Sequence, residues 1–494
     1  MVWTSWILTG IYTILFLQSF FWSKRISTSK FYISSDRKTP TGTAMISSIM
    51  TTCTIPVFLI LPTVATTEGG LTKCIIIGLS IIVGSTVTYL LIGERLRIYS
   101  EITGDSQTVP SYISSRFKDS TGWLRAFSAS LITVFMILLA AYTLSTAANI
   151  TAITFGMSKA STSVLICGGC LLCLYLGGMS SSTAADRIRS IIIFGTVLAV
   201  FVFLLFELIV GDNDHSSVKF IPKILSSETV SVETIFSCLG MSLGCVGFPT
   251  AIKRILMIKE RKPAKRFCIS PLIWCTVTTA GIFLISFIAI TNPSPATFIT
   301  ELLVGLENGH PNIIFNAIID SLVFVSFLLA IMSITEGSIL AAAATFSSDI
   351  FNTSITHETD EKKKLIANKI TVLSVGFTAF LLALGNNTMP IMEPSFVWAT
   401  MGSCFGPVIL FSLYCRRLTT KGAVASMTAG LLTVLIWKFI LSSLGGIFSI
   451  YEILPGFIVS TIVLYLVSYI DRQKPSDRML NEFGRMCEIV KMPR

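Results

Sequence analysis

The stretch TAMISSIMTTCTIPVFLILPTVATT, residues 43–67, is apolar enough to cross a membrane but carries two prolines and the polar run 51–54. A second apolar stretch, 233–250, carries three glycines and a proline within its last eleven residues. Proline removes a backbone donor and glycine weakens a helix, so both stretches predict interrupted membrane helices. Irregular backbone at membrane depth is tolerated only where it lines a cavity. The alternative is a pair of ordinary kinked helices.

The composition of the whole chain also indicates the bilayer. Of its 494 residues, 52% are apolar and 13% are charged, whereas soluble domains carry about 25% charged residues. Apolar runs of the length that crosses about 30 Å of hydrocarbon recur along the chain. We therefore expect an all-α polytopic membrane protein of about 13 transmembrane helices. The expected spans are 3–21, 43–67, 74–93, 126–149, 161–178, 188–210, 233–250, 269–291, 318–349, 367–385, 394–414, 421–441 and 454–471.

The two interrupted spans are the second and the seventh, five positions apart. This spacing is typical of two inverted five-helix repeats, whose first members carry the broken helices. The expected organisation is then a first transmembrane helix and cytoplasmic loop (1–42), a ten-helix inverted-repeat transport core (43–414), two C-terminal transmembrane helices (415–471) and a cytoplasmic tail (472–494).

The basic residues predict the orientation of the chain. Every second connecting segment is rich in lysine and arginine, and these segments together hold 32 of the 37 basic residues. The positive-inside rule then places the N-terminus outside and the C-terminus in the cytoplasm of a plasma membrane, such as a bacterial inner membrane. The net charge of +10 does not indicate nucleic acid, because the basic residues lie between the spans.

One carboxylate, Glu336, falls at mid-depth in the ninth expected span, three residues after Ser333. The two side chains share a helix face. A carboxylate there costs about 2.5–3.5 kcal/mol even on a lenient scale, so Glu336 should face a cavity, pair with a cation or be protonated. The alternatives are a neutral Glu336 bonded to a backbone carbonyl and a Ser333 bonded within its own helix.

Other classes of site find no support in the residue pattern. The twelve cysteines are scattered, and Cys167, Cys170 and Cys173 have no histidine nearby. The three histidines lie in separate loops, and the chain has no P-loop. We therefore expect no enzyme activity, no cofactor, no metal beyond sodium and no ATP-driven transport by this chain alone.

Three C-terminal segments resemble, in order, those of a known family: FGPVILFS (405–412), LTVLIWK (432–438) and YEILPGFI (451–458). Upstream, Arg37 and the segment TVPSY (108–112) extend the similarity over nearly the whole chain. The chain resembles the sodium/solute symporter family, and within it the bacterial sodium/proline symporters. The resemblance implies a LeuT-type core with sodium coupling.

The resemblance also directs attention to particular site residues. Asp186 matches an acidic residue of the family, and Tyr142 lies near a tyrosine of its fourth helix. For the cation we expect the carbonyls of Met50, Cys53 and Ala330, the hydroxyl of Ser333, and the carboxylates of Asp186 and Glu336. For the solute we expect Thr52, Thr54, Tyr142, Gly244, Gly247 and Pro249.

Several residues depart from the family at this same site. The second of two hydroxyl residues that serve the family's sodium site is Ile334 here. An acidic residue of the proline symporters is replaced by Thr52, and two of their aromatic positions hold Met241 and Cys245. These replacements weaken the expectation of sodium and of proline more than the expectation of the fold.

The leading hypothesis is a secondary active symporter that couples inward sodium movement to uptake of a small solute, such as proline or another amino acid. One alternative is a proton-coupled symporter that uses Glu336. Another is a transport-incompetent solute sensor. The expected partners are a small-molecule solute, a monovalent cation and membrane lipids, with no nucleic acid and no obligatory protein partner.

Overall fold

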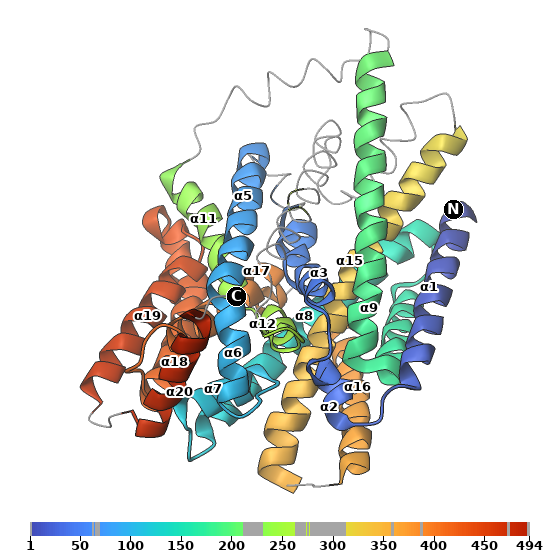
Figure 1. Cartoon of the computed structure of the whole chain (residues 1–494). Helices are drawn as coiled ribbons and strands as arrows, with labels where there is room; N and C mark the ends of the chain where they lie inside the picture. The colour runs from blue at the N-terminus through green and yellow to red at the C-terminus, as the bar shows by residue number, and fades with distance from the viewer. Residues whose placement is uncertain are drawn as a thin grey trace.

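The computed structural model describes residues 2–61, 64, 70–210, 231–261, 273, 276, 313–356, 360–385, 389–471 and 475–491. These residues form an assembly of helices without a β-sheet (Figure 1). The longer helices are α1 (Val2–Ser23), α3 (Thr41–Thr52), α5 (Gly70–Thr88), α6 (Glu94–Ile102), α7 (Val109–Phe117), α8 (Trp123–Phe155), α9 (Lys159–Val210), α11 (Val232–Gly247), α12 (Pro249–Leu256), α15 (Ile313–Thr345), α16 (Glu361–Leu384), α17 (Pro394–Ser412), α18 (Thr420–Ile436), α19 (Ile453–Ile470) and α20 (Asp477–Lys491).

Short helical segments join or extend these helices. They are α2 (Ser29–Ser34), the π-helices η2 (Ile55–Ile60), η3 (Tyr89–Gly93), η6 (Phe346–Thr356) and η8 (Trp437–Leu441), and the 3₁₀ turns η1 (Ser35–Arg37), η7 (Pro390–Met392), η9 (Ser442–Leu444) and η10 (Gly446–Ser449).

Eleven helices within the described ranges are long and apolar enough to cross a membrane. This confirms an all-α membrane protein. One of them, Lys159–Val202, has 44 residues, and a continuous helix of that length would span about 66 Å, roughly twice the hydrocarbon thickness. The predicted span 269–291 lies outside the described residues except for positions 273 and 276. The count of thirteen crossings therefore stays a prediction.

The long segment α9 is broken at Gly178, where φ is 54° and ψ is −146°. Side-chain-bearing residues are essentially excluded from this backbone region. A Cβ atom at position 178 would also lie 2.6 Å from the carbonyl oxygen of Tyr32. The break falls where the predicted span 161–178 ends, so we interpret α9 as two crossings that turn at Gly178.

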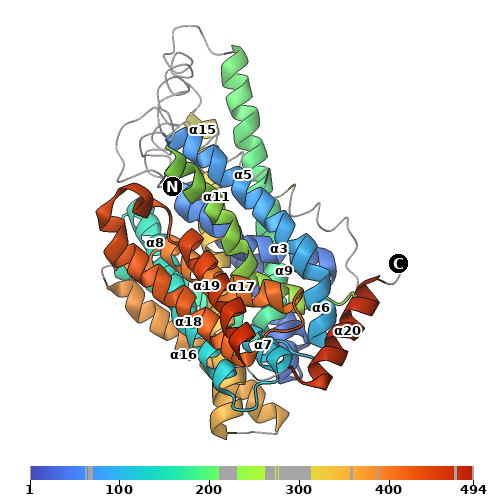
Figure 2. The same ribbon diagram turned by 90° about the vertical axis from the view of Figure 1, so that its left-hand side faces the viewer.

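The helices divide into a buried centre and a periphery. In Thr41–Ile60, Ser321–Phe351 and Pro394–Ser412, between 83% and 89% of the most apolar window is buried, against 17–28% in α1, α16, α18 and α19. Helix α15 packs against α8, α9 and α3, and α17 packs against α11 (Figures 1 and 2). Two of the stretches expected to carry the site, those with Thr52 and Ser333, thus lie in the buried centre of the fold, and Val232–Leu256, which contains the third, is 67% buried over its window.

The two expected interruptions take different forms. Between α11 and α12, Phe248 is extended, with φ −74° and ψ 120°, and Pro249 begins the next helix. In the first stretch the backbone stays helical through Cys53 and Thr54 and then widens into η2. Pro56 lacks the N–H that an α-helical bond would need, which accounts for the change of helix type. The end of that predicted span, 65–67, lies outside the described residues.

Candidate functional site

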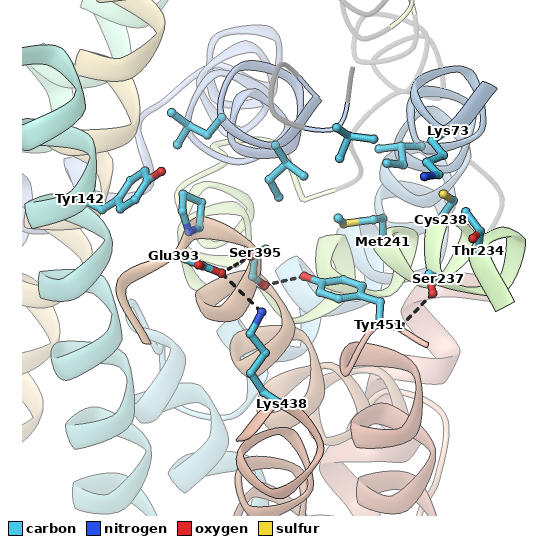
Figure 3. A pocket seen from close by; sticks show the side chains of 15 residues that line it. Lys73, Tyr142, Thr234, Ser237, Cys238, Met241, Glu393, Ser395, Lys438 and Tyr451 are labelled. Atoms are coloured by element: carbon cyan, nitrogen blue, oxygen red, sulfur yellow. Dashed lines mark hydrogen bonds and ion pairs between the residues drawn. The ribbon is translucent and has the colours of Figure 1, made fainter. Parts of the chain in front are cut away.

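A cavity of about 470 Å³ lies between the ends of the central helices, and both interrupted stretches contribute residues to its lining. Helices η2, α5, α8, α11 and α17 contribute its walls, together with η8 and the turn that precedes α19 (Figure 3). Its lining combines aliphatic side chains with a few polar ones. The residues are Leu59, Ile60, Val64, Lys73, Ile77, Tyr142, Thr234, Ser237, Cys238, Met241, Glu393, Pro394, Ser395, Lys438 and Tyr451.

An ion pair sits in this cavity (Figure 3). The Nζ atom of Lys438 lies 3.4 Å from Oε2 of Glu393, and both side chains keep substantial exposure, 30% and 47%. Beside the pair, the hydroxyl of Tyr451 donates to the carbonyl oxygen of Ser395 at 2.5 Å. The Tyr451 N–H donates to Oγ of Ser237 at 2.9 Å. The segments after α18 therefore contribute polar groups to a cavity between the central helices.

Of the predicted solute residues, Tyr142 lines this cavity, and Gly244 and Gly247 pack against α17. A Cβ atom at Gly244 would lie 2.0 Å from Nε1 of Trp398, and one at Gly247 would lie 2.5 Å from the backbone N of Gly406. The buried Trp398 donates to the carbonyl oxygen of Met241 at 3.0 Å. The two glycines thus permit the close approach of α11 to α17.

The predicted residues of the first stretch meet those of the second. Thr52 and Thr250 bring their hydroxyls to 2.9 Å, and Thr250, next to Pro249, also donates to the carbonyl oxygen of Thr51 at 3.3 Å. The Thr54 hydroxyl donates to the carbonyl oxygen of Met50. Cys53 is buried at the end of α3. The interrupted stretches therefore contact each other directly, as an inverted-repeat site requires.

Asp186 is the centre of a second, fully buried polar cluster. Its Oδ1 atom accepts the hydroxyl of Ser333 at 2.7 Å, and its Oδ2 atom accepts the hydroxyl of Ser47. Arg189 and Arg254 approach the same carboxylate at 3.2 Å and 3.5 Å. The structure thus brings together Asp186 and Ser333, which the sequence analysis had placed in the cation site.

The predicted carboxylate Glu336 belongs to this cluster through Arg189. Nη1 and Nη2 of Arg189 lie 2.9 Å and 2.5 Å from the two carboxylate oxygens of Glu336. Such bidentate pairs are strong and geometrically specific. Asp186, Arg189, Arg254 and Glu336 are each at most 2% exposed, and their formal charges cancel. We expected Glu336 to face a cavity, pair with a cation or be protonated. In the structure it pairs with a cationic side chain of the protein, Arg189.

Neither Arg189 nor Arg254 is among the predicted site residues. Both belong to basic connecting segments in the sequence, whereas the structure buries them in α9 and α12. The signal was present for Arg189, which lies three residues after Asp186 and so on the same helix face. No comparable local signal marks Trp398 or Glu393.

The backbone carbonyls of Met50, Cys53 and Ala330 are the remaining predicted cation ligands. All three residues are at most 2% exposed, and α3 packs against α15. Ser333 lies one helical turn after Ala330. These contacts leave the predicted ligand set compatible with the geometry, and its role stays a prediction.

The chain is similar to known proteins over most of its length. The model of the sodium:solute symporter family matches residues 32–430. The osmoregulated proline transporter OpuE of Bacillus subtilis is 29% identical over 420 residues, 84% of each chain. The sodium/proline symporter of Haemophilus influenzae is 26% identical over 450 residues, 87% of each chain.

Solved structures show the same fold. The substrate-bound outward-open state of a Na⁺-coupled sialic acid symporter aligns with a TM-score of 0.74 at 15% identity, covering 95% of this chain and 98% of that one. The structure of MhsT in complex with L-phenylalanine aligns with a TM-score of 0.52 at 11% identity and covers 87% of this chain and 97% of that one.

These matches confirm two of the expectations from the sequence. The family and the relatives are transporters and not enzymes. Together with the eleven helices able to cross a membrane among the described residues, they support a protein integral to the plasma membrane. The match over residues 32–430 covers most of the chain. The chain belongs to the sodium:solute symporter family.

Proposed function

We propose that this protein imports a small zwitterionic solute, such as proline or another amino acid, together with sodium. The observation that carries the proposal is the cavity in which Glu393 and Lys438 present opposite charges 3.4 Å apart among aliphatic walls. An α-amino acid carries the complementary pair of charges at a similar spacing. Its ammonium group would pair with Glu393 and its carboxylate with Lys438.

The exposure of the ion pair supports this exchange. Both side chains remain open to the cavity, so the pair is screened and its mutual attraction is worth at most about 1 kcal/mol. A zwitterion can therefore replace it at small cost. Small ligand sites commonly combine apolar walls with a few placed polar groups, and relatives of the chain are named proline transporters.

For sodium, the support comes from the family and from the packing of α3 against α15, the region of the predicted ligands. Sodium, as a hard cation, suits oxygen ligands, and we retain the carbonyls of Met50, Cys53 and Ala330 with the Ser333 hydroxyl. One sodium ion entering with a neutral zwitterion gains about 2.3 kcal/mol from a 100 mV potential. That energy corresponds to roughly fifty-fold accumulation before the sodium gradient contributes.

The pairing of Glu336 weighs against the proton-coupled alternative. A carboxylate that carries protons must be free to gain and lose them during the cycle, whereas both oxygens of Glu336 accept hydrogen bonds from Arg189.

The sensor alternative makes a different prediction, because a sensor binds solute without moving it across the bilayer. Net flux therefore separates it from a symporter.

Uptake of radiolabelled proline and other amino acids into proteoliposomes tests the solute class. Glu393→Gln and Lys438→Gln should each raise the KM of the transported solute about tenfold or more, because each removes one charged partner of the zwitterion. The matched control is Lys421→Gln, which removes an exposed partner of Asp471 outside the cavity. An unchanged KM in both cavity variants contradicts the proposed solute site.

A further inference from the structure

A second cavity, of about 490 Å³, lies at the opposite end of the central helices from the first. Thr39 and Thr43, at the beginning of α3, line it, whereas Leu59 and Ile60, at the end of the same span, line the cavity of Figure 3. It is therefore on the side of the basic connecting segments. Its remaining walls come from the end of α1, the segment around α2, and α9 just after the break at Gly178.

Three cationic side chains from three different segments border this cavity. Arg25 follows α1 and stacks over the ring of Trp22 at 5.2 Å, and Lys38 lies 5.9 Å from the ring centroid of Phe31. Arg187, on α9, donates through Nη1 to Oγ1 of Thr43 at 3.0 Å. Within the described part of the chain, Asp36 forms an ion pair with one of them, Lys38, at 3.0 Å. The cavity thus has an excess of positive charge.

The inner wall adds hydroxyl groups to these charges. Ser35, Ser180 and Thr183 all line the cavity and are at most 6% exposed. The hydroxyls of Ser180 and Thr183 donate within the protein, to Ser35 at 2.7 Å and to the carbonyl oxygen of Met179. The guanidinium and ammonium groups are therefore the donors for phosphate oxygens. The chemistry of the cavity therefore suits a phosphate-bearing group.

The cavity lies at the end of the exposed apolar surface of α1. Helix α1 exposes Phe16, Leu17, Phe20 and Phe21 along its length, with exposures of 39–63%, as a lipid-facing helix does. Trp22 and Arg25 come directly after this apolar surface, and tryptophan is enriched at the membrane–water boundary. A ligand that reaches the cavity along α1 arrives at headgroup depth.

We propose that this cavity binds the phosphate headgroup of an anionic phospholipid, with Arg25, Lys38 and Arg187 as the charged contacts. Trp22 and Phe31 would pack against the glycerol and the first methylenes of the acyl chains. Basic pockets between membrane helices on the side of the basic loops bind such headgroups. The bound lipid would join the end of α1 to the start of α3 and to α9, beside the Arg187–Thr43 hydrogen bond.

The test uses the full-length protein in a neutral detergent, titrated with phosphatidylglycerol, phosphatidylcholine or inorganic phosphate. Native mass spectrometry counts bound lipids. We expect the wild type to bind phosphatidylglycerol at least about tenfold more tightly than phosphatidylcholine, because each basic residue attracts the anionic headgroup. The triple variant Arg25→Gln/Lys38→Gln/Arg187→Gln should lose most of that preference. Inorganic phosphate at millimolar concentration should displace little of the lipid, because it lacks the apolar contacts.

Two matched variants keep the test decisive. Lys362→Gln/Arg416→Gln/Arg485→Gln removes three exposed charges elsewhere and should leave the preference unchanged. Arg25→Lys/Lys38→Arg/Arg187→Lys keeps the charge and should keep most of the preference, which a merely misfolded triple variant would not explain. Equal loss in both neutralised triples overturns the proposal, as does a wild type without preference. Complete displacement by inorganic phosphate assigns the cavity to a soluble anion and overturns the lipid source.

Discussion

Arg189 and Glu336 form an ion pair in the buried centre of the helices. Each charge is stabilised there by the opposite charge of its partner. Removing one partner of a buried pair leaves an uncompensated charge, which costs about 3–5 kcal/mol, whereas removing both is much cheaper. We predict that Arg189→Gln and Glu336→Gln each lower the thermal stability of the purified protein strongly. The double variant should recover more than half of the loss.

A double-mutant cycle of melting temperatures in detergent measures this coupling. The exposed pair Asp36 and Lys38, whose side chains are 39% and 66% exposed, serves as the control, and its cycle should show a coupling of about 1 kcal/mol or less. Additive losses in the Arg189 and Glu336 cycle would show that the two side chains do not depend on each other.

Gly178 supports a different prediction at the same scale. Its positive φ and its closeness to Tyr32 leave no room for a side chain. We predict that Gly178→Ala destabilises the protein by about 1–3 kcal/mol from backbone strain alone. Gly195→Ala, in the same element but with nothing within 4 Å of an added Cβ, should be neutral or stabilising. Equal melting temperatures for the two variants would refute the assigned turn.

At the scale of elements, hydrogen bonds connect the segment that follows α12 to the start of α3. Glu260, beyond α12, accepts hydrogen bonds from the N–H and the hydroxyl of Thr41 at the start of α3, at 3.0 Å and 2.5 Å. The backbone N–H of Lys259 donates to the carbonyl oxygen of Thr39 at 2.9 Å. The segment after α12 therefore holds the first turn of α3.

This link is expected to depend on pH. Partial burial opposes the charge of Glu260, but the hydrogen bonds from Thr41 outweigh it and lower the pKa of this carboxyl. The carboxyl of Glu260 has a lower pKa in the folded state than in the unfolded state, where it is about 4.3. It therefore stabilises the fold at pH values above 4.3, and this contribution is lost as the pH falls through the folded pKa. The melting temperature of Glu260→Gln should lie below that of the wild type at pH 6–8, and the gap should close below about pH 4.

The exposed Asp477 provides the matched control for this pH series. Asp477→Asn, measured at the same pH values, should show no comparable gap. A gap for Glu260→Gln that stays constant down to pH 3 would mean that the carboxylate charge is not what stabilises the start of α3.

At the scale of the whole molecule, the helices and the family were accessible from sequence because both depend on local patterns. Apolar length predicts spans, and Gly247 and Pro249 mark the break between α11 and α12. The form of the first stretch was harder, since Pro56 can either break a helix or widen it, and the backbone stays helical there. The helix formed by the tail, α20, was not anticipated; it packs on α6.

The candidate site was less accessible because its contacts join residues distant in the chain. Lys438 lies inside a span, and its partner Glu393 is 45 residues away. In the sequence, Arg189 resembles the basic loop residues that set membrane orientation. Its pairing with Glu336 is seen only in the structure. A positive-inside count cannot separate these cases, since it uses only the position of a charge along the chain.

Sodium-driven accumulation in proteoliposomes tests the central claim most directly. With the membrane potential clamped, an inward sodium gradient should drive the accumulation of an amino acid, proline first, above its external concentration. Ser333→Ala should abolish the sodium dependence, because it removes a proposed ligand, whereas Ser130→Ala, an exposed serine bonded only to its own helix, should not. Equal accumulation with and without the sodium gradient would contradict the account, as would solute binding without net flux.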